Sequence, residues 1–434
     1  MTNTQKIADY IYYSSSRKIP EEVMNYGRLC LADWMSVSIG ALTEDAARVV
    51  YETTKENHQR GKSHLLLGGI ADSLTAALCN GTLAHCLDFD DTHIKSNTHT
   101  SGPLWAATLA LGQELDSTEE EILRAFITGF EVSTRVGYGV GEIITEKGWH
   151  CTGIFGAIGS AASACVLLKL NQAQIINALS AAATQASGLT VSFGTMAKPF
   201  HAGKAAFNGI LGAKLAKNGF VAQQDMFAIN GGFISALVQD KTAELTAVHF
   251  DNWEILNNSF KPYAACHLVH PAVDCIKKML EKIMLDQIRQ VKVEVGELAM
   301  QVTGHKSGKP QSPLEAKFDI RYCIALALKG ADLMVKDFSD QAIYHPETIK
   351  LTELVDVKAS QEMGYTSAKL HCHLKNGATE IFEVAISKGH PGRPISWDDM
   401  KIKFNHLVDN QHLWDHIRLF GERKPFTLLN FLNK

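Results

Sequence analysis

The stretch Ala71-Asp-Ser-Leu-Thr-Ala-Ala-Leu-Cys-Asn-Gly-Thr-Leu-Ala-His-Cys86 runs directly into Leu87-Asp-Phe-Asp-Asp-Thr-His93. Its first part has the smooth apolar pattern of a helix, and its second part places a polar cluster where that helix ends. With the nearby His99, the cluster holds three carboxylates, a hydroxyl and two imidazoles. Groups that move protons or hold an anionic substrate are commonly placed at such junctions, because the scaffold there is rigid. The alternative is a helix end whose acidic residues simply face water.

The size and composition of the chain limit the functions that are possible. Its 434 residues suggest two domains, or one large and one small domain. Hydrophobic residues make up 46%, which is enough for a large core. The net charge of −4 and the lack of a basic run argue against non-specific nucleic-acid binding, which needs a basic surface. We therefore expect no nucleic-acid partner.

Cysteine usage and hydropathy indicate a cytoplasmic protein. The nine cysteines are an odd number with scattered spacing and no CxxC, which is typical of reduced thiols. Residues 1–16 lack a basic region leading into an apolar run, so no signal peptide is predicted. The uncharged stretch Cys151 to Leu168 is nearly long enough to span a bilayer. The stretch is rich in Gly, Ala and Ser and lacks an aromatic belt. These features favour a buried helix instead, so we expect no membrane partner.

Helical patterns dominate the chain up to about Phe260. Ser117 with Glu120 predicts a capping box that opens a helix with apolar positions from Ile122 to Phe130. Asn171 begins another helix, with Ile175, Ile176 and Leu179 on its apolar side. Residues 203–217 carry small residues along one side, and such residues let helices approach closely: Gly209, Gly212, Ala213 and Ala216. The one candidate extended piece in this part is His64-Leu-Leu-Leu67.

The pattern changes after His270. A helix is predicted from Pro271 to Ile283, with proline in its first turn. Val291, Val293 and Val295 then alternate with polar residues, as in a strand. Two further strand patterns, 369–374 and 379–386, flank Asn376-Gly377, which is the strongest short hairpin signal.

The predicted fold class is therefore mainly α, with a large all-helical domain and a smaller α+β domain. The large domain spans 1–265 and is completed by 396–434, where Ser396 caps a helix that starts at Trp397. The α+β domain spans 266–395.

Two metal sites are possible alternatives. His371-Cys372-His373 lies in a predicted strand, where alternate side chains face opposite ways, so Cys372 cannot join the two histidines. The acidic cluster with His85, His93 and His99 offers suitable ligands but lacks HxxxH or HExxH spacing. We predict no metal at either place.

Nucleotide binding and serine hydrolysis have little support. Gly137-Tyr-Gly-Val-Gly141 lacks the last glycine of the dinucleotide fingerprint and does not follow a predicted strand. No GxxxxGK[ST] and no GxSxG occurs in the chain.

Three further segments carry candidate chemistry. His150 stands where a glycine-rich helix begins, and the helix dipole there favours a neutral imidazole, which suits a base. The segment Lys198-Pro-Phe-His201-Ala-Gly-Lys204 surrounds a turn before a helix, a natural cradle for a carboxylate. The segment Lys261 to His270 lies at the domain boundary, and interdomain clefts are favoured ligand sites. A buried structural histidine, an exposed basic loop and an ordinary linker are the respective alternatives.

Taken together, these residues resemble the MmgE/PrpD family, which includes 2-methylcitrate dehydratases, cis-aconitate decarboxylases and iminodisuccinate epimerases. The resemblance covers nearly the whole chain. It is carried by Leu87-Asp-Phe-Asp-Asp-Thr92, His99-Thr-Ser-Gly, Trp149-His150, Gly194-Thr-Met-Ala-Lys-Pro-Phe-His201-Ala-Gly203, Lys261-Pro-Tyr263 through His270-Pro271, and Glu315-Ala-Lys-Phe-Asp-Ile-Arg-Tyr322.

The resemblance implies a homodimer, a smaller domain that acts as a lid, and chemistry without a metal or organic cofactor. It implies active-site positions at Asp88, Thr92, His99, His150, Lys198, Lys261 and Tyr322. Where the decarboxylases have a histidine five residues after the lysine, this chain has Cys266, with His267 next to it. Cys266, His267, His270 and His201 remain further candidates for substrate binding.

The resemblance also implies proton transfer next to a carboxylate, which needs cations for the carboxylates, a base and an acid. We expect Lys198 and Lys261 to bind carboxylates and His150 to act as base or proton donor. Asp88 would orient His99 or Thr92, and Tyr322 would close the site or donate a proton. The favoured function is a lyase that dehydrates a small di- or tricarboxylate, because Cys266 departs from the decarboxylase pattern. Decarboxylation, epimerisation and a non-catalytic anion-binding protein stay open.

Overall fold

The structure is a computed structural model, and it describes residues 1–434 except 228–230, 241–244, 246–247, 306 and 423–434. The chain forms two compact units. The first contains Met1–Ser259 and Met400–Lys434, and the second contains Phe260–Asp399. These breaks lie a few residues from the predicted boundaries, and we propose the two units as the two domains. Long helices and only short strands make the chain mainly α, as predicted.

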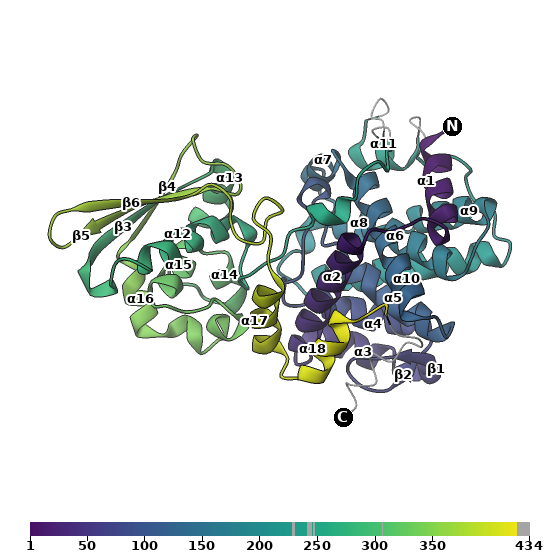
Figure 1. Ribbon diagram of the computed structural model, residues 1–434, viewed down its shortest axis with the longest axis horizontal. Helices are drawn as coiled ribbons and strands as arrows, with labels where there is room; N and C mark the ends of the chain where they lie inside the picture. The colour runs from purple at the N-terminus through teal and green to yellow at the C-terminus, as the bar shows by residue number, and fades with distance from the viewer. Residues whose placement is uncertain (228–230, 241–244, 246–247, 306, 423–434) are drawn as a thin grey trace. The chain divides into compact units, whose positions relative to one another are not determined.

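The first unit is built from helices (Figure 1). A small antiparallel pair, β1 (His58–His64) and β2 (Ile70–Ala71), lies beside them. The predicted extended piece at 64–67 overlaps this pair only at His64. The helices are α1 (Asn3–Tyr12), α2 (Glu21–Gly40), α3 (Asp45–Thr53), α4 (Ser73–His85), α5 (Ser101–Glu114), α6 (Glu119–Gly137), α7 (Gly141–Glu146), α8 (Cys151–Leu167), α9 (Gln172–Ala183), α10 (Ala197–Lys217), α11 (Phe233–Val238), α17 (Trp397–Leu407) and α18 (Gln411–Arg418).

Small residues let the central helices α4, α8 and α10 pack backbone against backbone. A Cβ added at Gly81 of α4 would lie 2.8 Å from the Cα of Gly203 in α10. A Cβ added at Gly209 would lie 2.6 Å from the backbone nitrogen of Ala161 in α8. Larger residues at these crossings would push the helices apart. The predicted small-residue stripe of α10 is buried, and its close-packing function is confirmed.

The uncharged helix α8 lies in the core of this unit. All of its residues except Val166 are buried, as the composition of the stretch predicts. Among the described residues, none of the helices is both long and apolar enough to cross a membrane.

One predicted helix start is wrong by a residue. The capping box of α6 is formed by Thr118 and Glu121, whose side chains each accept from the other's backbone N–H at 3.2 and 2.9 Å. Ser117 does not take this position because its own N–H donates to Gly112 O at 2.9 Å and closes the end of α5. The start of α9 at Asn171 is confirmed by its capping box with Gln174.

The second unit contains a four-stranded sheet in the order β4-β3-β5-β6. β3 (Ile288–Val295) is the predicted strand, and its alternating valines 291, 293 and 295 are buried. β5 (Ala368–Leu374) and β6 (Thr379–Val384) form the predicted hairpin, with Gly377 at φ +91° in the turn. β4 (Val355–Ala359) pairs parallel to β3 and was not predicted.

The helices of the second unit include the predicted one after His270. α12 (His270–Leu280) packs against β5 and β6, and it has its proline in the first turn as expected. The others are α13 (Glu297–Ala299), α14 (Pro313–Lys317), α15 (Ile320–Leu328) and α16 (Pro346–Thr352) (Figure 1). At the far end of the chain, Ser396 caps α17 by accepting from Asp399 N at 3.1 Å, as predicted.

Candidate active site

The polar stretch after α4 forms a tightly held loop in the first unit. The chain leaves α4 through Asp88, which has φ +51°, a left-handed conformation that aspartate tolerates better than most residues. Thr92 then exchanges backbone hydrogen bonds with Ser259 at 2.8 and 2.9 Å. The backbone N–H of His99 donates to Thr152 Oγ1 of α8 at 3.1 Å, which ties the end of the loop to the core.

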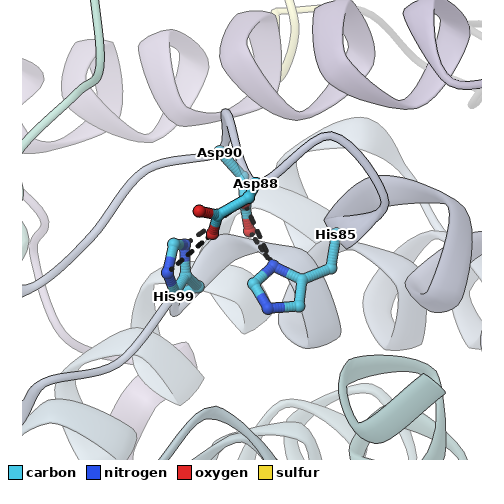
Figure 2. Close-up of side chains that lie close together, drawn as sticks. All are labelled: His85, Asp88, Asp90 and His99. Carbon is cyan, nitrogen blue, oxygen red and sulfur yellow. Dashed lines mark hydrogen bonds and ion pairs between the residues drawn. The ribbon is translucent and has the colours of Figure 1, made fainter. Parts of the chain in front are cut away.

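Asp90 joins two histidines at the centre of this loop (Figure 2). His85 Nδ1 lies 2.9 Å from Asp90 Oδ2, and His99 Nδ1 lies 3.2 Å from Asp90 Oδ1. A carboxylate can only accept, so we infer that His85 Nδ1 carries the proton that faces Asp90, whereas His99 Nδ1 lies near Asp90 without a hydrogen bond to it. The Nε2 atom of His85 is buried and has no hydrogen-bond partner among the described residues.

A cation completes the cluster from α10. Lys198 Nζ lies 2.6 Å from Asp88 Oδ1, and His99 Nε2 lies 3.6 Å from the same oxygen. The ammonium group also lies 5.3 Å from the centre of the Phe193 ring. Asp88 and Lys198 are each about one-sixth exposed and His99 is 14% exposed, so these three side chains are more accessible than the buried His85 and Asp90.

His150 and His201 extend the site along α8 and α10. His150 occupies the N-cap position of α8, as predicted, and is only 4% exposed. Its ring stacks on that of His85 with centroids 5.7 Å apart, and its Nδ1 lies 3.1 Å from His201 Nδ1. Four imidazoles, two carboxylates and one ammonium group therefore lie close together.

Burial and neighbouring charges shift the acid–base properties of these groups. Burial lowers the pKa of His85 to about 4, with Lys198 adding to the effect and Asp90 opposing it. Burial, with help from His85 and Lys198, holds the pKa of His150 well below its usual value. Burial raises the pKa of Asp90, but the nearby His85 and His99 outweigh it and hold the pKa well below normal. At neutral pH His85 and His150 are thus neutral, and Asp90 is ionised.

A buried network underneath holds the loop in place. Lys403 Nζ donates to Asp33 Oδ1 and to the carbonyl of Phe89, both at 2.6 Å. Asp33 in turn accepts from the backbone N–H of Asp91 at 3.0 Å. Asp91 accepts from Asn258 Nδ2 at 2.6 Å, and burial with the charge of Asp33 raises its pKa to about 7. The network fixes the backbone on both sides of Asp90.

Protein groups already contact several of the atoms that could bind a metal in this cluster. His85, Asp88, Asp90 and His99 each offer one atom within 4.8 Å of the others, a spacing that could hold a metal ion. A metal needs the lone pair of a neutral imidazole. Here the Nδ1 atoms point at Asp90, and the Asp88 oxygen already holds Lys198.

The other metal candidates find protein partners instead. His93 Nε2 faces Glu254 at 3.1 Å and its Nδ1 faces Ser96, so it lies outside the cluster. His371 Nε2 lies 3.1 Å from Glu294 and His373 Nδ1 lies 2.9 Å from Thr379. Cys372 is buried, so it does not share their face, in agreement with the strand argument.

Thr92 is the remaining predicted residue of the first unit. Its side chain is buried at the edge of the loop, and its Oγ1 has no hydrogen-bond partner among the described residues. A buried hydroxyl without a partner costs stability, so such a group is suited to bind a ligand.

The remaining predicted residues lie in the second unit. Lys261 is buried, and His270 Nε2 lies 3.1 Å from the carbonyl of Ala265. The rings of His267 and His270 meet edge to face at 4.9 Å, and the backbone N–H of Cys266 donates to the carbonyl of Lys317 at 3.0 Å. Within this unit the segment 261–270 is thus a folded, hydrogen-bonded structure.

Tyr322 lies in the interior of the second unit. Its ring is fully buried in α15, and its hydroxyl donates to the carbonyl of Ala342 at 3.2 Å. Burial raises the pKa of this phenol well above its usual value, so it stays neutral at physiological pH. Its function in closing the site or donating a proton stays a prediction.

His85 and Asp90 belong to the cluster but were not among the predicted catalytic residues. From the sequence, Asp90 is part of the polar stretch without a function of its own, and His85 is a candidate metal ligand only. Their spacing is the signal that points to them. A histidine lies in the last turn of a helix, and an aspartate follows five residues later, after a left-handed residue. This geometry lets the two side chains come into contact.

Comparisons with known proteins place the chain in a family. The family model of the MmgE/PrpD N-terminal domain matches residues 5–246, and that of the MmgE/PrpD C-terminal domain matches residues 263–413. The first match lies within the first unit, and the second covers most of the second unit and the start of the returning segment. The chain belongs to the MmgE/PrpD family, as its motifs predict.

Several curated relatives are similar over most of the chain. Cis-aconitate decarboxylase of Aspergillus terreus is 26% identical over 385 residues, which cover 83% of this chain and 79% of that protein. The protein of the same name from Homo sapiens is 26% identical over 360 residues, 79% of this chain and 74% of its own. That from Mus musculus is 26% identical over 348 residues, 76% and 70%.

Proposed function

We propose that this protein is a lyase that acts on a small di- or tricarboxylate without a metal or organic cofactor. The observation that carries the proposal is the position of two neutral, buried imidazoles, His85 and His150, beside the ammonium group of Lys198. A carboxylate binds to the cation, and a neutral imidazole next to it can take a proton from the adjacent carbon. Membership in a family with carboxylate-acting lyases supports the same class.

The reaction that we favour is dehydration, as in a 2-methylcitrate dehydratase. Dehydration starts with removal of the proton next to a carboxylate, which needs a neutral base, and His150 is held neutral by its surroundings. An acid then protonates the departing hydroxyl. Cys266, at the position where decarboxylases have a histidine, fits this choice.

The individual residues would then have distinct functions. Lys198 and Lys261 would each bind a substrate carboxylate, and Thr92 Oγ1 would donate to one. Asp88 holds Lys198 and faces His99, so it would orient both. Cys266, His267 and His270 of the second unit, together with Tyr322, are further proposed contributors. A homodimer is part of the same proposal.

The second candidate is decarboxylation, because the curated relatives named above are cis-aconitate decarboxylases. In that reaction CO₂ leaves first, and a histidine then gives a proton to carbon. The same side chains can either remove a proton from carbon or give a proton to carbon. The choice between the two reactions therefore depends on which substrate the site accepts.

A proton NMR time course in D₂O with EDTA tests the proposal. The panel contains 2-methylcitrate, citrate, cis-aconitate, iminodisuccinate and tartrate. Loss of a hydroxylated substrate to an alkene supports dehydration, and itaconate from cis-aconitate supports decarboxylation. Deuterium incorporation without net loss would indicate epimerisation and overturn the lyase. Activity that appears only after zinc or magnesium replaces EDTA would overturn metal independence.

A further inference from the structure

The contact between His150 and His201 links the buried site to solvent. Their Nδ1 atoms lie 3.1 Å apart, and two neutral imidazoles can meet this way only if one Nδ1 donates and the other accepts. His150 is 4% exposed at the start of α8, whereas His201 is partly exposed in α10. The pair therefore runs from the interior toward water.

The backbone around the pair keeps the two rings together. Gly188 accepts from the backbone N–H of His150 at 3.0 Å. A Cβ added at Gly188 would lie 3.1 Å from His201 Nδ1, so only a bare backbone fits between the pair and the loop. Phe193 packs edge-on against the His150 ring with centroids 4.9 Å apart. The His150–His201 contact is thus built into the packing.

A buried base needs such a route. If His150 takes a proton from carbon on Nε2, it must lose one elsewhere before the next turnover. Burial lowers the pKa of both His150 and His201, so neither holds an extra proton for long at neutral pH. Of the described residues, His201 is the one whose side chain is within hydrogen-bond distance of His150 Nδ1.

We propose that His201 is a proton relay between His150 and solvent, an inference that rests on the proposed function. Before the reaction, His150 Nδ1–H donates to His201 Nδ1 and His201 carries its proton on Nε2. When His150 Nε2 gains the substrate proton, its Nδ1 proton passes to His201 Nδ1, and His201 Nε2 releases a proton to water. Both rings end neutral with exchanged tautomers. When His150 Nε2 then gives its proton to the departing hydroxyl, the reverse steps bring a proton from water through His201 to His150 Nδ1 and restore the starting tautomers.

This function differs from the substrate binding that the sequence predicts for His201. A substrate ligand acts mainly on KM, whereas a relay acts on the regeneration of the base and hence on kcat. His201 is a positioning residue in this proposal, because it acts through His150.

Chemical rescue distinguishes a relay from a structural residue. In His201→Ala, kcat should fall by roughly 10-fold to 100-fold with KM little changed, and free imidazole should restore it in proportion to its concentration. His201→Phe fills the space, so imidazole should not rescue it. Lys217→Ala, which removes an exposed ammonium group from the last turn of the same helix, should behave like the wild type. Wild-type kcat in His201→Ala, or a loss that imidazole does not repair, would overturn the relay.

A second measurement needs no substrate. In protein labelled with ¹⁵N-histidine, the His150 signals, assigned by their loss in His150→Ala, should show the Nδ1–H tautomer. His201→Ala should convert them to a mixture of tautomers. An unchanged His150 tautomer would contradict the relay. Failure of every substrate in the wild type would instead contradict the proposed function, so the two failures are distinguishable.

Discussion

At the residue scale, Asp90 determines what its two histidine neighbours can do. By accepting from Nδ1 of His85 and lying against Nδ1 of His99, it directs the Nε2 atom of each ring away from itself. Burial of Asp90 and His85 keeps their contact dry, and a dry carboxylate strengthens the basicity of the imidazole that it orients. The acid–base chemistry of the site thus depends on a residue that need not touch substrate.

His150→Ala should abolish turnover while the protein stays folded. Removal of the proposed base is expected to lower kcat/KM by about 10²-fold to 10⁴-fold. Circular dichroism should remain that of the wild type, because His150 caps α8 only through its backbone. His345→Ala, at an exposed histidine of the second unit, is the matched control and should keep full activity. Near-wild-type turnover of His150→Ala would refute the assignment.

His85 should make stability depend on pH in a defined window. Its pKa is about 4 in the folded protein and 6.5 when unfolded, so between these values the unfolded chain binds more protons. The free energy of unfolding should therefore decrease as pH falls from 6.5 to about 4, by roughly 3 kcal/mol for this group. Its contribution is fully present above pH 6.5.

The comparison with His85→Gln isolates this contribution. Glutamine can still donate to Asp90 but does not titrate. Asp91, with its pKa raised to about 7, changes stability with the opposite sign, so only the difference between the two proteins reports on His85. Urea denaturation at pH 7 and pH 5 should show a smaller loss in His85→Gln than in the wild type. Equal losses would mean that His85 is not held neutral by the fold.

At the element scale, Lys403 of α17 should hold the site loop. Lys403→Met leaves Asp33 buried without its cation, which is expected to cost about 3–5 kcal/mol of unfolding free energy. It also frees the carbonyl of Phe89, between Asp88 and Asp90, so kcat should fall in the protein that remains folded. Urea denaturation and activity assays measure the two effects.

A double variant separates charge from position. Asp33→Asn with Lys403→Met removes both charges while the asparagine oxygen still accepts from Asp91 N. Stability should recover in part, whereas activity should stay low because the Phe89 carbonyl still lacks its donor. Full recovery of activity would show that Lys403 matters only as a counter-charge.

The elements also show how far sequence reasoning reaches. Local signals that act within a few residues were sufficient for the Asn376-Gly377 hairpin, the alternating valines of β3 and the small-residue face of α10. The capping box was misplaced because Ser117 and Thr118 each precede a glutamate by three residues, and only the closure of α5 chooses between them. β4 was missed because a short strand depends on its partner more than on its own pattern.

The site could be predicted only in part, because its contacts join residues that are far apart in the sequence. His99, His150 and Lys198 stand out in the sequence, but their distances in the chain say nothing about their contacts. The Asp88–Lys198 pair spans 110 residues and the Lys403–Asp33 pair spans 370. The resemblance to a family supplied the residues, whereas the contacts among His85, His150 and His201 came from the packing of α4, α8 and α10.

At the scale of the whole molecule, the first unit is discontinuous in sequence. The segment after Asp399 returns to it with a set of buried polar anchors. His416 Nε2 lies 2.6 Å from Glu119, and Lys403 pairs with Asp33. Arg28 Nε donates to the carbonyl of Phe420 at 2.7 Å. Phe404 and Trp414 add apolar area to the same core. The second unit is a continuous segment with its own core.

This asymmetry predicts different effects of truncation. A chain that ends at Asp399 removes Lys403 and His416, the side-chain partners of the buried carboxylates Asp33 and Glu119, together with buried aromatic rings, so the first unit should lose its cooperative unfolding transition. A chain that ends at Glu422 keeps every described contact of this segment and serves as the control. Residues 260–399 expressed alone should fold, because their sheet and helices close on one another. Near-UV circular dichroism and urea unfolding of the three chains provide the comparison. A truncated chain ending at Asp399 that unfolds like the control would mean that the site loop is held by residues 1–259 alone, and Lys403 would then have no positioning function.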